Sequence, residues 1–488
     1  MGVSYDKRKT NKYSHMKIKD FHYRKISFIL LAMVLLFFAC DKNNTIEIPE
    51  QNEDPVDTQI EIAWVFFKDK PSKSSFLANP TTMLSQKSIQ RRTRQNILLD
   101  DNDVPIEKTY YTQINNMVGI KIMAKSKWLN ALHIEGTKTN INKLKQLSFV
   151  AKVEFADKSL NVSGRIANTK RSHHPENKFG YISTDYNYGN GSSQIQMLGG
   201  DGLHQQNYTG NGMIIAVIDG GFPGVDTFIA FKRLRDQNKI LGGYNYVTRS
   251  NNFYTGVSHG TAVLSTIASY INNQFIGTAP DASFYLFITE DGTKETPLEE
   301  SLWVEAAEKA DSLGVDIINT SLGYFTFDNP KHDYSYADMN GTKTFISRGA
   351  EIGFSRGMII VNAAGNEGSN SWKYIIAPAD AKSVLSVGAV DANKIIASFS
   401  SFGPTADGRV KPDVLAQGLN AFVINSAGQI APSSGTSFAS PIMTGVIACY
   451  WQKNYTKKNT EIIQMIKESA HLYNNPSPQY GFGIPKFN

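Results

Sequence analysis

From residue 192 onward, short apolar segments alternate with stretches of helical periodicity. In the clearest helix, Pro297–Leu313, Thr296 is placed to act as N-cap and Glu299 to complete a capping box. Such alternation predicts an α/β fold, with a doubly wound, mostly parallel sheet covered by helices on both faces. Sites in these sheets form at the carboxyl ends of strands. The expected strands are 213–218, 283–288, 315–319, 358–363, 384–390 and 421–425.

A smaller α+β unit is predicted upstream, over residues 59–155. Its expected strands are 60–67, 128–135 and 149–154, and its expected helices are 82–96 and 139–147. The first helix carries Arg91, Arg92 and Arg94 and is expected to expose them as a basic face. The acidic run 100–103 lacks the glycine of a calcium loop and is interpreted as a turn.

Residues 156–186 are polar and without apolar periodicity, which is typical of a linker. Its adjacent histidines, His173 and His174, have no partner at ligand spacing, so a solvated loop is the favoured interpretation over a metal site. The second domain then covers residues 187–488.

The N-terminal segment has the pattern of an export signal, predicted over residues 1–39. A basic region precedes the apolar segment 26–39, which is too short for the ~20 residues of a membrane-spanning helix. Because Cys40 follows directly after Ala39, the segment resembles a bacterial lipoprotein signal, in which this cysteine is lipidated. An ordinary signal peptide with an incidental cysteine is the alternative. The acidic segment 40–58 suits a flexible tether, and Met16 is a second possible start.

Charge and cysteine content exclude several classes of protein. The formal charge of +6 lies in residues 1–40, which hold eight Lys/Arg and two Asp/Glu; subtraction from the totals of 50 and 44 leaves 42 of each sign. A body of zero net charge has no bulk attraction for nucleic acid. Two cysteines, Cys40 and Cys449, exclude a disulfide framework and Cys-rich zinc sites. Cys449 lies in an apolar helix and is predicted to be a buried thiol.

Four short segments of the larger domain carry side chains suited to catalysis, although each has a plainer explanation. Asp219 ends an apolar strand, where a turn aspartate is common. His259 begins a helix, where structural histidines are commoner than catalytic ones. Asn366 follows a strand between glycines, as a turn asparagine would. Ser437 lies at the start of a helix, where it is either an N-cap or a nucleophile beside unpaired backbone N–H groups.

Together, the four segments in the order Asp, His, Asn, Ser resemble the subtilases, the subtilisin-like serine proteases. The strongest match is Gly-Thr-Ser-Phe-Ala-Ser-Pro at residues 435–441. The resemblance implies that Ser437 is the nucleophile, His259 its base, Asp219 the partner of the histidine, and Asn366 an oxyanion donor. It also implies substrate-binding segments, which are Ser321, Leu322, Gly323 on one side and Ala363, Ala364, Gly365 on the other.

Three departures from the family pattern concern neighbours of these residues. Ala262 replaces the second histidine of His-Gly-Thr-His, Tyr324 replaces the second glycine of Ser-Leu-Gly-Gly, and Gly220 replaces Ser or Thr. None removes a catalytic group, but Tyr324 is expected to narrow or reshape the substrate subsites. The family also implies that 59–155 is an inhibitory propeptide, and the hydrophilic linker that follows predicts a maturation cut between residues 157 and 184.

The expected function is therefore a secreted serine endopeptidase, made as a zymogen and acting through an acyl-enzyme. Its partners would be a polypeptide substrate, its own propeptide and a membrane, through Cys40; it would be a monomer and would not bind nucleic acid. No cofactor is required, and no calcium or other metal site is assigned. It would be a cell-envelope lipoprotein, at the outer membrane or cell surface, or fully secreted without lipidation. Two alternatives are a catalytically silent subtilase-fold binding module and, more weakly, an esterase, which would need Gly-x-Ser-x-Gly.

Overall fold

The structure is a computed structural model that describes residues 58–161 and 186–487. Residues 57–488 form one compact unit, and everything below concerns this unit. The predictions for the export signal, Cys40, His173 and His174 lie outside the described residues. Within the described part, no helix is long and apolar enough to cross a membrane.

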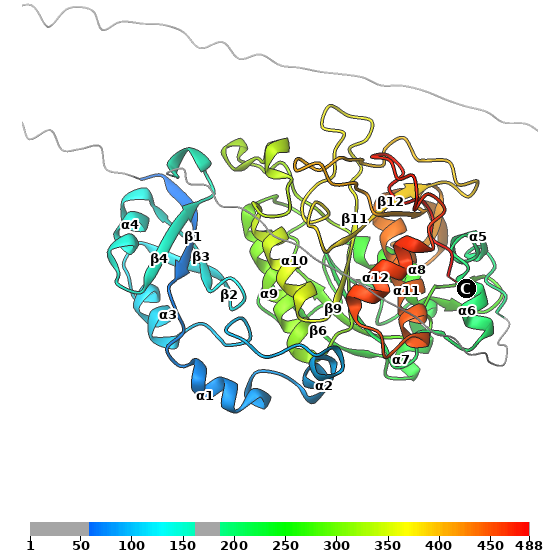
Figure 1. Cartoon of the computed structure of the whole chain (residues 1–488), viewed down its shortest axis with the longest axis horizontal. Coiled ribbons are helices and arrows are strands. Elements are labelled where there is room, and N and C mark those ends of the chain that lie inside the picture. Colours follow the sequence, from blue (N-terminus) through cyan, green and yellow to red (C-terminus); the bar gives the residue numbers. More distant parts are fainter. Residues whose placement is uncertain (1–57, 162–185, 488) are drawn as a thin grey trace, which may run out of the picture. The chain divides into compact units, whose positions relative to one another are not determined.

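A seven-stranded sheet forms the centre of the larger domain (Figure 1). Every neighbouring pair of strands is parallel, which confirms the predicted fold class. The strands, in spatial order, are β13 (Val414–Gln417), β12 (Leu385–Val390), β11 (Ile359–Ala363), β10 (Ile317–Thr320), β5 (Ile214–Asp219), β9 (Ser283–Ile288) and β6 (Ile240–Asn245).

The strand predictions for this sheet were wrong in three places, one of which is that the edge strand β13 was missed. Residues 421–425 were expected among the sheet strands, but β14 (Ala421–Ile424) pairs antiparallel with β15 (Ile430–Ser433) in a separate hairpin. The edge strand β6 was missed, because its two glycines, Gly242 and Gly243, weaken the strand pattern. A short apolar run identifies a strand but not its partner.

Alternate residues of the central strands build one core on each face of the sheet. Ile215 and Val217 face α8 (His259–Ala268) and α11 (Thr436–Lys453). Ile214, Ala216 and Ile218 face α9 (Pro297–Leu313) and α10 (Phe345–Ser355). Helix α9 has the predicted bounds, and the Thr296 N–H donates to Glu299 Oε2 at 2.9 Å as the capping box requires. The remaining elements of this domain are α5 (Ser192–Gln196), α6 (Gly200–Gln205), α7 (Lys232–Asp236), α12 (Asn459–Glu468), β7 (Tyr270–Ile271) and β8 (Phe275–Ile276).

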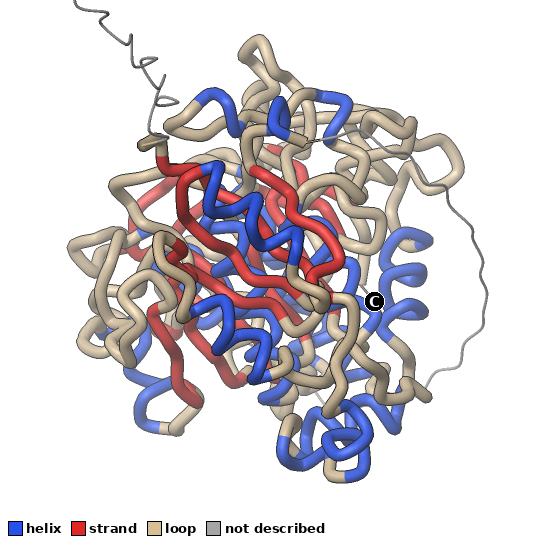
Figure 2. Tube along the Cα trace, turned by 90° about the vertical axis from the view of Figure 1, so that its left-hand side faces the viewer, coloured by secondary structure: helices blue, strands red, loops and turns tan. Residues whose placement is uncertain are grey.

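The α+β unit is a four-stranded antiparallel sheet in the order β2-β3-β1-β4. In Figure 2 its strands (red) lie behind helices (blue) on the side toward the viewer. Ala63 and Val65 pack under these helices, whereas Trp64 and Phe66 join the core that contains α9 and α10. The elements are β1 (Ile60–Phe67), α1 (Lys73–Ala78), α2 (Gln86–Gln95), α3 (Lys108–Asn115), β2 (Ile120–Ser126), β3 (Ala131–Thr137), α4 (Lys138–Lys143) and β4 (Val150–Phe155).

The prediction that the arginines of α2 are exposed was wrong. The arginines of α2 were expected on an exposed basic face, but Arg91 is 3% and Arg92 2% exposed. Their partners include Asp311, 220 residues away along the chain. The acidic run 100–103 forms the predicted turn, with the Asp103 N–H donating to the Asp100 carbonyl at 3.0 Å, but Asp103 is itself buried against Arg92.

Candidate active site

The predicted site residues follow the ends of three adjacent strands. Asp219 is the last residue of β5, Ser321 follows β10 and Asn366 lies three residues beyond β11. The register pairs Thr320 with Ile218 on one side and with Asn362 on the other, so these ends are level. Because the strands are parallel, the three segments leave the sheet at one edge.

The two remaining predicted residues come from helices on one face of the sheet. His259 is the first residue of α8, and Ser437 is the second residue of α11. The rings of His259 and Phe438 lie 6.1 Å apart, which brings the starts of both helices together. Helix N-termini carry unpaired N–H groups and a partial positive charge, suited to a developing anion.

Asp219 and His259 form a hydrogen bond of 2.8 Å between Oδ1 and Nδ1. The same carboxylate oxygen accepts the Gly220 N–H at 2.8 Å. Asp219 is buried, whereas 39% of the His259 side chain is exposed. The Asp219 charge, aided by this hydrogen bond and opposed by burial, raises the pKa of His259 above its usual 6.5.

A glycine permits this close approach of α8 to β5. A Cβ added to Gly260 would lie 2.4 Å from the Gly221 carbonyl oxygen and 2.9 Å from Asp219 Cβ. No side chain fits there without moving the first turn of α8 away from the strand. The glycine after His259 is therefore required for the Asp219–His259 distance.

Ser437 and Ser321 are joined by two hydrogen bonds. Ser437 Oγ donates to the Ser321 carbonyl at 3.2 Å, and Ser321 Oγ donates to the Ser437 carbonyl at 2.8 Å. Among the described residues, no hydrogen bond joins Ser437 Oγ to the His259 ring. Such bonds are often long or absent before substrate binds, and rotation about the Cα–Cβ bond of Ser437 re-aims its hydroxyl.

The side chain of Asn366 is oriented by the turn that precedes α11. Its Oδ1 accepts from the Thr436 N–H at 2.9 Å and from Thr436 Oγ1 at 3.0 Å. The amide nitrogen Nδ2 therefore points away from Thr436 and lies 3.7 Å from the position of a Cβ on Gly435. Asn366 thus presents a donor next to the start of α11.

The two predicted substrate-binding segments lie at the carboxyl ends of the neighbouring strands β10 and β11. Asn362 Nδ2 donates to the Leu322 and Ala363 carbonyls, at 3.1 and 2.7 Å, and so links the segments 321–323 and 363–365. Gly323 packs so closely that an added Cβ would be 2.7 Å from the Ile376 side chain. Gly365 has φ +110°, a value that side chains rarely tolerate.

Comparison with known proteins gives matches to both parts of the chain. A family described as "Subtilase family" matches residues 210–483, and "Peptidase S8 propeptide domain, Bacteroidota" matches residues 62–175. Subtilisin NAT of Bacillus subtilis subsp. natto is 33% identical over 294 residues, covering 59% of this chain and 68% of that protein.

The chain belongs to the subtilase family.

The subtilisin of Bacillus pumilus is 32% identical over 294 residues, covering 59% of this chain and 94% of that protein. A solved structure, MycP1 with its N-terminal propeptide removed, matches with a TM-score of 0.48 and 20% identity, covering 60% of this chain and 94% of that one. The two family matches and the similarity to subtilisins make the chain a serine-type endopeptidase, a hydrolase, with a propeptide domain.

Two of the positions at which this subtilase departs from the family's sequence pattern can be explained by their surroundings in the structure. A Cβ on Gly220 would lie 2.5 Å from Val257 Cγ2, so the usual Ser or Thr would require the Val257 side chain to move. Consistently, Asp219 Oδ2 is buried and has no hydrogen-bond partner among the described residues. Tyr324 is 1% exposed, and its N–H donates to the Ala377 carbonyl at 2.8 Å. Its ring is therefore buried beside the substrate-binding segment instead of projecting from it.

Sequence reasoning missed Glu290, which the Tyr324 hydroxyl contacts at 2.7 Å. Glu290 lies two residues beyond β9, and its Cβ is 3.6 Å from the position of a Cβ on Gly220. Burial raises its pKa to about 7, against the opposing hydrogen bonds from Tyr324 and Thr289. Its charge also contributes to the raised pKa of His259. Its position just after a predicted strand was the one available signal.

Residues 58–161 and 186–487 hold no group of three or more His, Cys, Asp or Glu side chains that could bind a metal ion. Cys449 is fully buried, as predicted, with Sγ 3.3 Å from the Thr278 carbonyl. Burial raises the pKa of this thiol well above its usual value, so it remains protonated.

Proposed function

We propose that Asp219, His259 and Ser437 are the catalytic triad of this endopeptidase and that Asn366 stabilises the oxyanion. The observation that carries the proposal is the 2.8 Å hydrogen bond between Asp219 and His259. This bond lies at the carboxyl ends of the parallel strands, near the start of α11. Asp219 would hold the imidazole with its proton on Nδ1, leaving Nε2 free to accept a proton. The raised pKa of His259 suits a base that becomes an imidazolium.

The reaction would proceed in two stages. Ser437 Oγ turns from the Ser321 carbonyl, gives its proton to His259 Nε2 and attacks the peptide carbonyl carbon. The C–N bond then breaks, and the proton passes from His259 to the leaving amine, which gives an acyl-enzyme. Water attacks the ester with His259 as base, releasing the acid and restoring the Ser437 hydroxyl.

The oxyanion would be stabilised by two kinds of donor. Asn366 Nδ2 is free to donate, because its Oδ1 is held by Thr436. The Ser437 N–H, at the positive end of α11, is the second donor. An extended substrate would add a strand beside residues 321–323, with the side chain before the cleaved bond against residues 363–365.

For the whole protein, we propose a zymogen that is exported and anchored to the cell envelope through a lipid on Cys40. The export pattern of residues 1–39 supports this location. The protein would act as a monomer and would require no cofactor. Cys40→Ala should move the protein from the membrane fraction to the soluble fraction; an unchanged distribution would exclude the anchor.

The triad is tested by labelling the detergent-solubilised full-length protein with a fluorophosphonate, which reacts with activated serines. Labelling should require Ser437 and be lost in Ser437→Ala. Casein cleavage by the labelled preparation distinguishes a protease from an esterase. A folded wild-type protein without label, even after an added protease removes residues 41–184, would favour the catalytically silent binding module.

A further inference from the structure

The peptide carbonyl that Ser437 attacks has its place between the two substrate-binding segments. Ser437 Oγ donates to the carbonyl of Ser321, the first residue of one segment, at 3.2 Å. Asn366, the proposed oxyanion donor, directly follows Gly365, the last residue of the other segment. The side chain that precedes the cleaved bond therefore enters the space between these two segments.

A third side chain already occupies the depth of this space. A Cβ added to Gly323 would lie 2.7 Å from both Cγ1 and Cδ1 of Ile376. A Cβ added to Gly365 would lie 3.1 and 3.2 Å from the same two atoms. The isoleucine is therefore in van der Waals contact with the backbone of both segments and lies between them. Ile376 is 7% exposed, as expected for a side chain enclosed by two walls.

The backbone on both sides of Ile376 is fixed by hydrogen bonds. The Tyr324 N–H donates to the Ala377 carbonyl at 2.8 Å, and the Ala377 N–H donates to the Tyr324 carbonyl at 3.2 Å. On the other side, the Ile375 N–H donates to the Phe402 carbonyl at 3.1 Å. Backbone movement therefore cannot carry the isoleucine out of the space without breaking these pairs.

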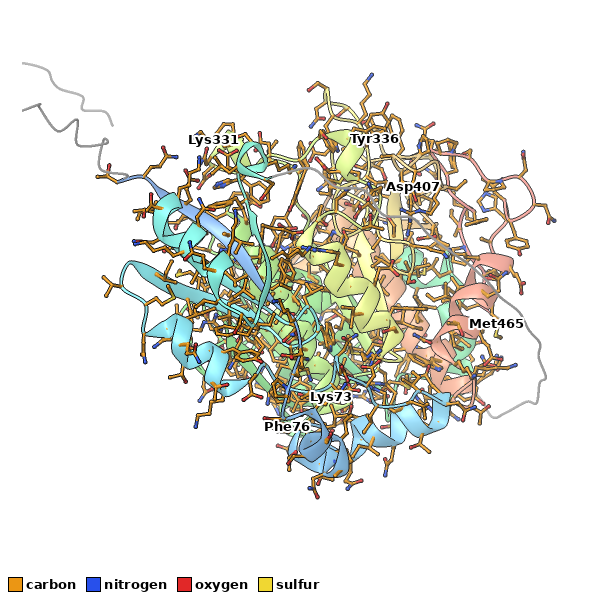
Figure 3. The ribbon with its side chains drawn as sticks, turned by 60° about the vertical axis from the view of Figure 1, so that its left-hand side comes forward. Lys73, Phe76, Lys331, Tyr336, Asp407 and Met465 are labelled. Atoms are coloured by element: carbon orange, nitrogen blue, oxygen red, sulfur yellow. The ribbon has the colours of Figure 1, made fainter. Side chains whose placement is uncertain are left out.

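Aromatic contacts hold the loops that continue the two segments. The ring of Phe325, two residues beyond Gly323, lies 4.6 Å from the ring of Trp372, in the loop after β11. The ring of Tyr374 in this loop lies 4.2 Å from that of Tyr336, in the loop after β10. Figure 3 shows Tyr336 at the upper end of the molecule together with Asp407, whose loop accepts a hydrogen bond from the Tyr336 hydroxyl at 2.7 Å. Because these loops support one another, the walls are not free to spread.

We propose that Ile376 fills the depth of the pocket for the residue before the cleaved bond, so that this protease cleaves after glycine, alanine or serine and rejects large side chains. This rests on the proposed function, because it takes Ser437 as the nucleophile and segments 321–323 and 363–365 as the pocket walls. A small side chain ends above the isoleucine. A large one has to displace Ile376 or part the walls, and overfilling a packed site is unfavourable.

The degree of discrimination follows from the space that the isoleucine takes. One methylene too many or too few in an apolar pocket changes kcat/KM by roughly 10–200-fold. Phenylalanine exceeds alanine by a whole ring, although partial relaxation of the pocket limits the loss. Alanine before the cleaved bond should therefore be favoured over phenylalanine by at least roughly 100-fold in kcat/KM.

The test compares two peptides that differ only in the residue before the cleaved bond, alanine or phenylalanine. The matured wild-type protein and its variants are assayed on each peptide, and mass spectrometry of the products identifies the bond that is cut. The ratio of the two kcat/KM values is compared, because it does not depend on the fraction of active protein. Ile376→Ala should reduce the preference for alanine at least roughly tenfold, mainly by faster cleavage of the phenylalanine peptide. Ile376→Val, a milder variant if Ile376→Ala does not fold, should reduce it roughly threefold or more.

The matched control is Ile375→Ala, which removes the same atoms from the adjacent residue. The Ile375 side chain is buried and packs with Ala364 and Ala379. Any loss of activity in this variant is shared by both peptides, so the ratio should change less than roughly threefold. Ile375→Val serves in the same way beside Ile376→Val.

The fluorophosphonate separates failure of this proposal from failure of the triad. A wild-type protein that is labelled at Ser437 and cleaves the phenylalanine peptide as fast as the alanine peptide would overturn the role of Ile376 and leave the proposed function standing. Equal ratios in Ile376→Ala and Ile375→Ala would also overturn that role. A folded protein that takes no label and cleaves neither peptide would overturn the triad, and the role of Ile376 with it.

Discussion

Replacing Gly260 by alanine should damage catalysis without removing any chemical group. The added Cβ would lie 2.4 Å from the Gly221 carbonyl oxygen, whereas ordinary van der Waals contact begins at 3.4 Å. Because that oxygen and Asp219 Cβ belong to the rigid end of β5, the first turn of α8 must move by about 1 Å. A displacement of 1 Å costs ~10²-fold in rate, so kcat should fall by about that factor.

The assay is peptide hydrolysis by the matured wild-type, Gly260→Ala and Gly202→Ala proteins, each checked by its thermal unfolding curve. Gly202 is the matched control, because it lies in helix α6 and a Cβ there meets nothing within 4 Å. Gly202→Ala should keep full activity and gain up to ~1 kcal/mol of stability. A Gly260→Ala protein with kcat within about threefold of wild type would show that the Asp219–His259 distance does not depend on this glycine.

Three further predictions concern the same domain. Asn366→Ala should lower kcat by ~10²–10³ with little change in KM, as loss of this donor does in subtilisin, and a kcat within about threefold of wild type would refute the role of the amide N–H. The pH profile of kcat/KM should have an acidic limb above pH 6.5, because His259 accepts a proton only when neutral and its pKa is raised; Glu290→Gln should move that limb to lower pH, and a move to higher pH would contradict the assignment. Trp303→Ala should destabilise the protein by ~3–5 kcal/mol in denaturant unfolding, since Trp303 is fully buried and donates to Thr320 Oγ1 at 3.0 Å; a loss under ~1 kcal/mol would refute that reasoning.

The local sequence predicted most of the central strands of the parallel sheet but not its two edge strands. Helix α9 was predicted to the residue, because its N-cap Thr296, its first-turn proline and Glu299 are all local sequence signals. The strands β6 and β13 were missed and 421–425 was misassigned, since pairing depends on residues far along the chain. Tertiary pairing, not propensity, decided those elements.

The same distinction explains the errors around the active site. The four proposed site residues were predicted from their residue types and neighbouring glycines, which are local features, and from their order along the chain. Glu290 was missed because its significance arises from Tyr324 and Gly220, which only the fold brings near. The arginines of α2 were taken for solvent-exposed residues because arginine is rarely buried without a partner, and the partner, Asp311, is not a neighbour in sequence.

Helix α2 contacts the chain just before the amino ends of β5, β10 and β11, and the architecture of a parallel sheet explains what this position permits. Active sites in such a sheet form at the carboxyl ends of the strands, so a partner that binds at the amino ends need not compete with substrate. The central strand β10 has only four residues. At ~3.3 Å per residue, its amino and carboxyl ends are about 13 Å apart. This strand is buried on both faces and hydrogen-bonded to β5 and β11. Its two ends are therefore held rigidly relative to each other. The contacts of Lys87 and Arg91 at the amino ends of the strands can therefore stabilise the sheet that positions Asp219 and Ser321.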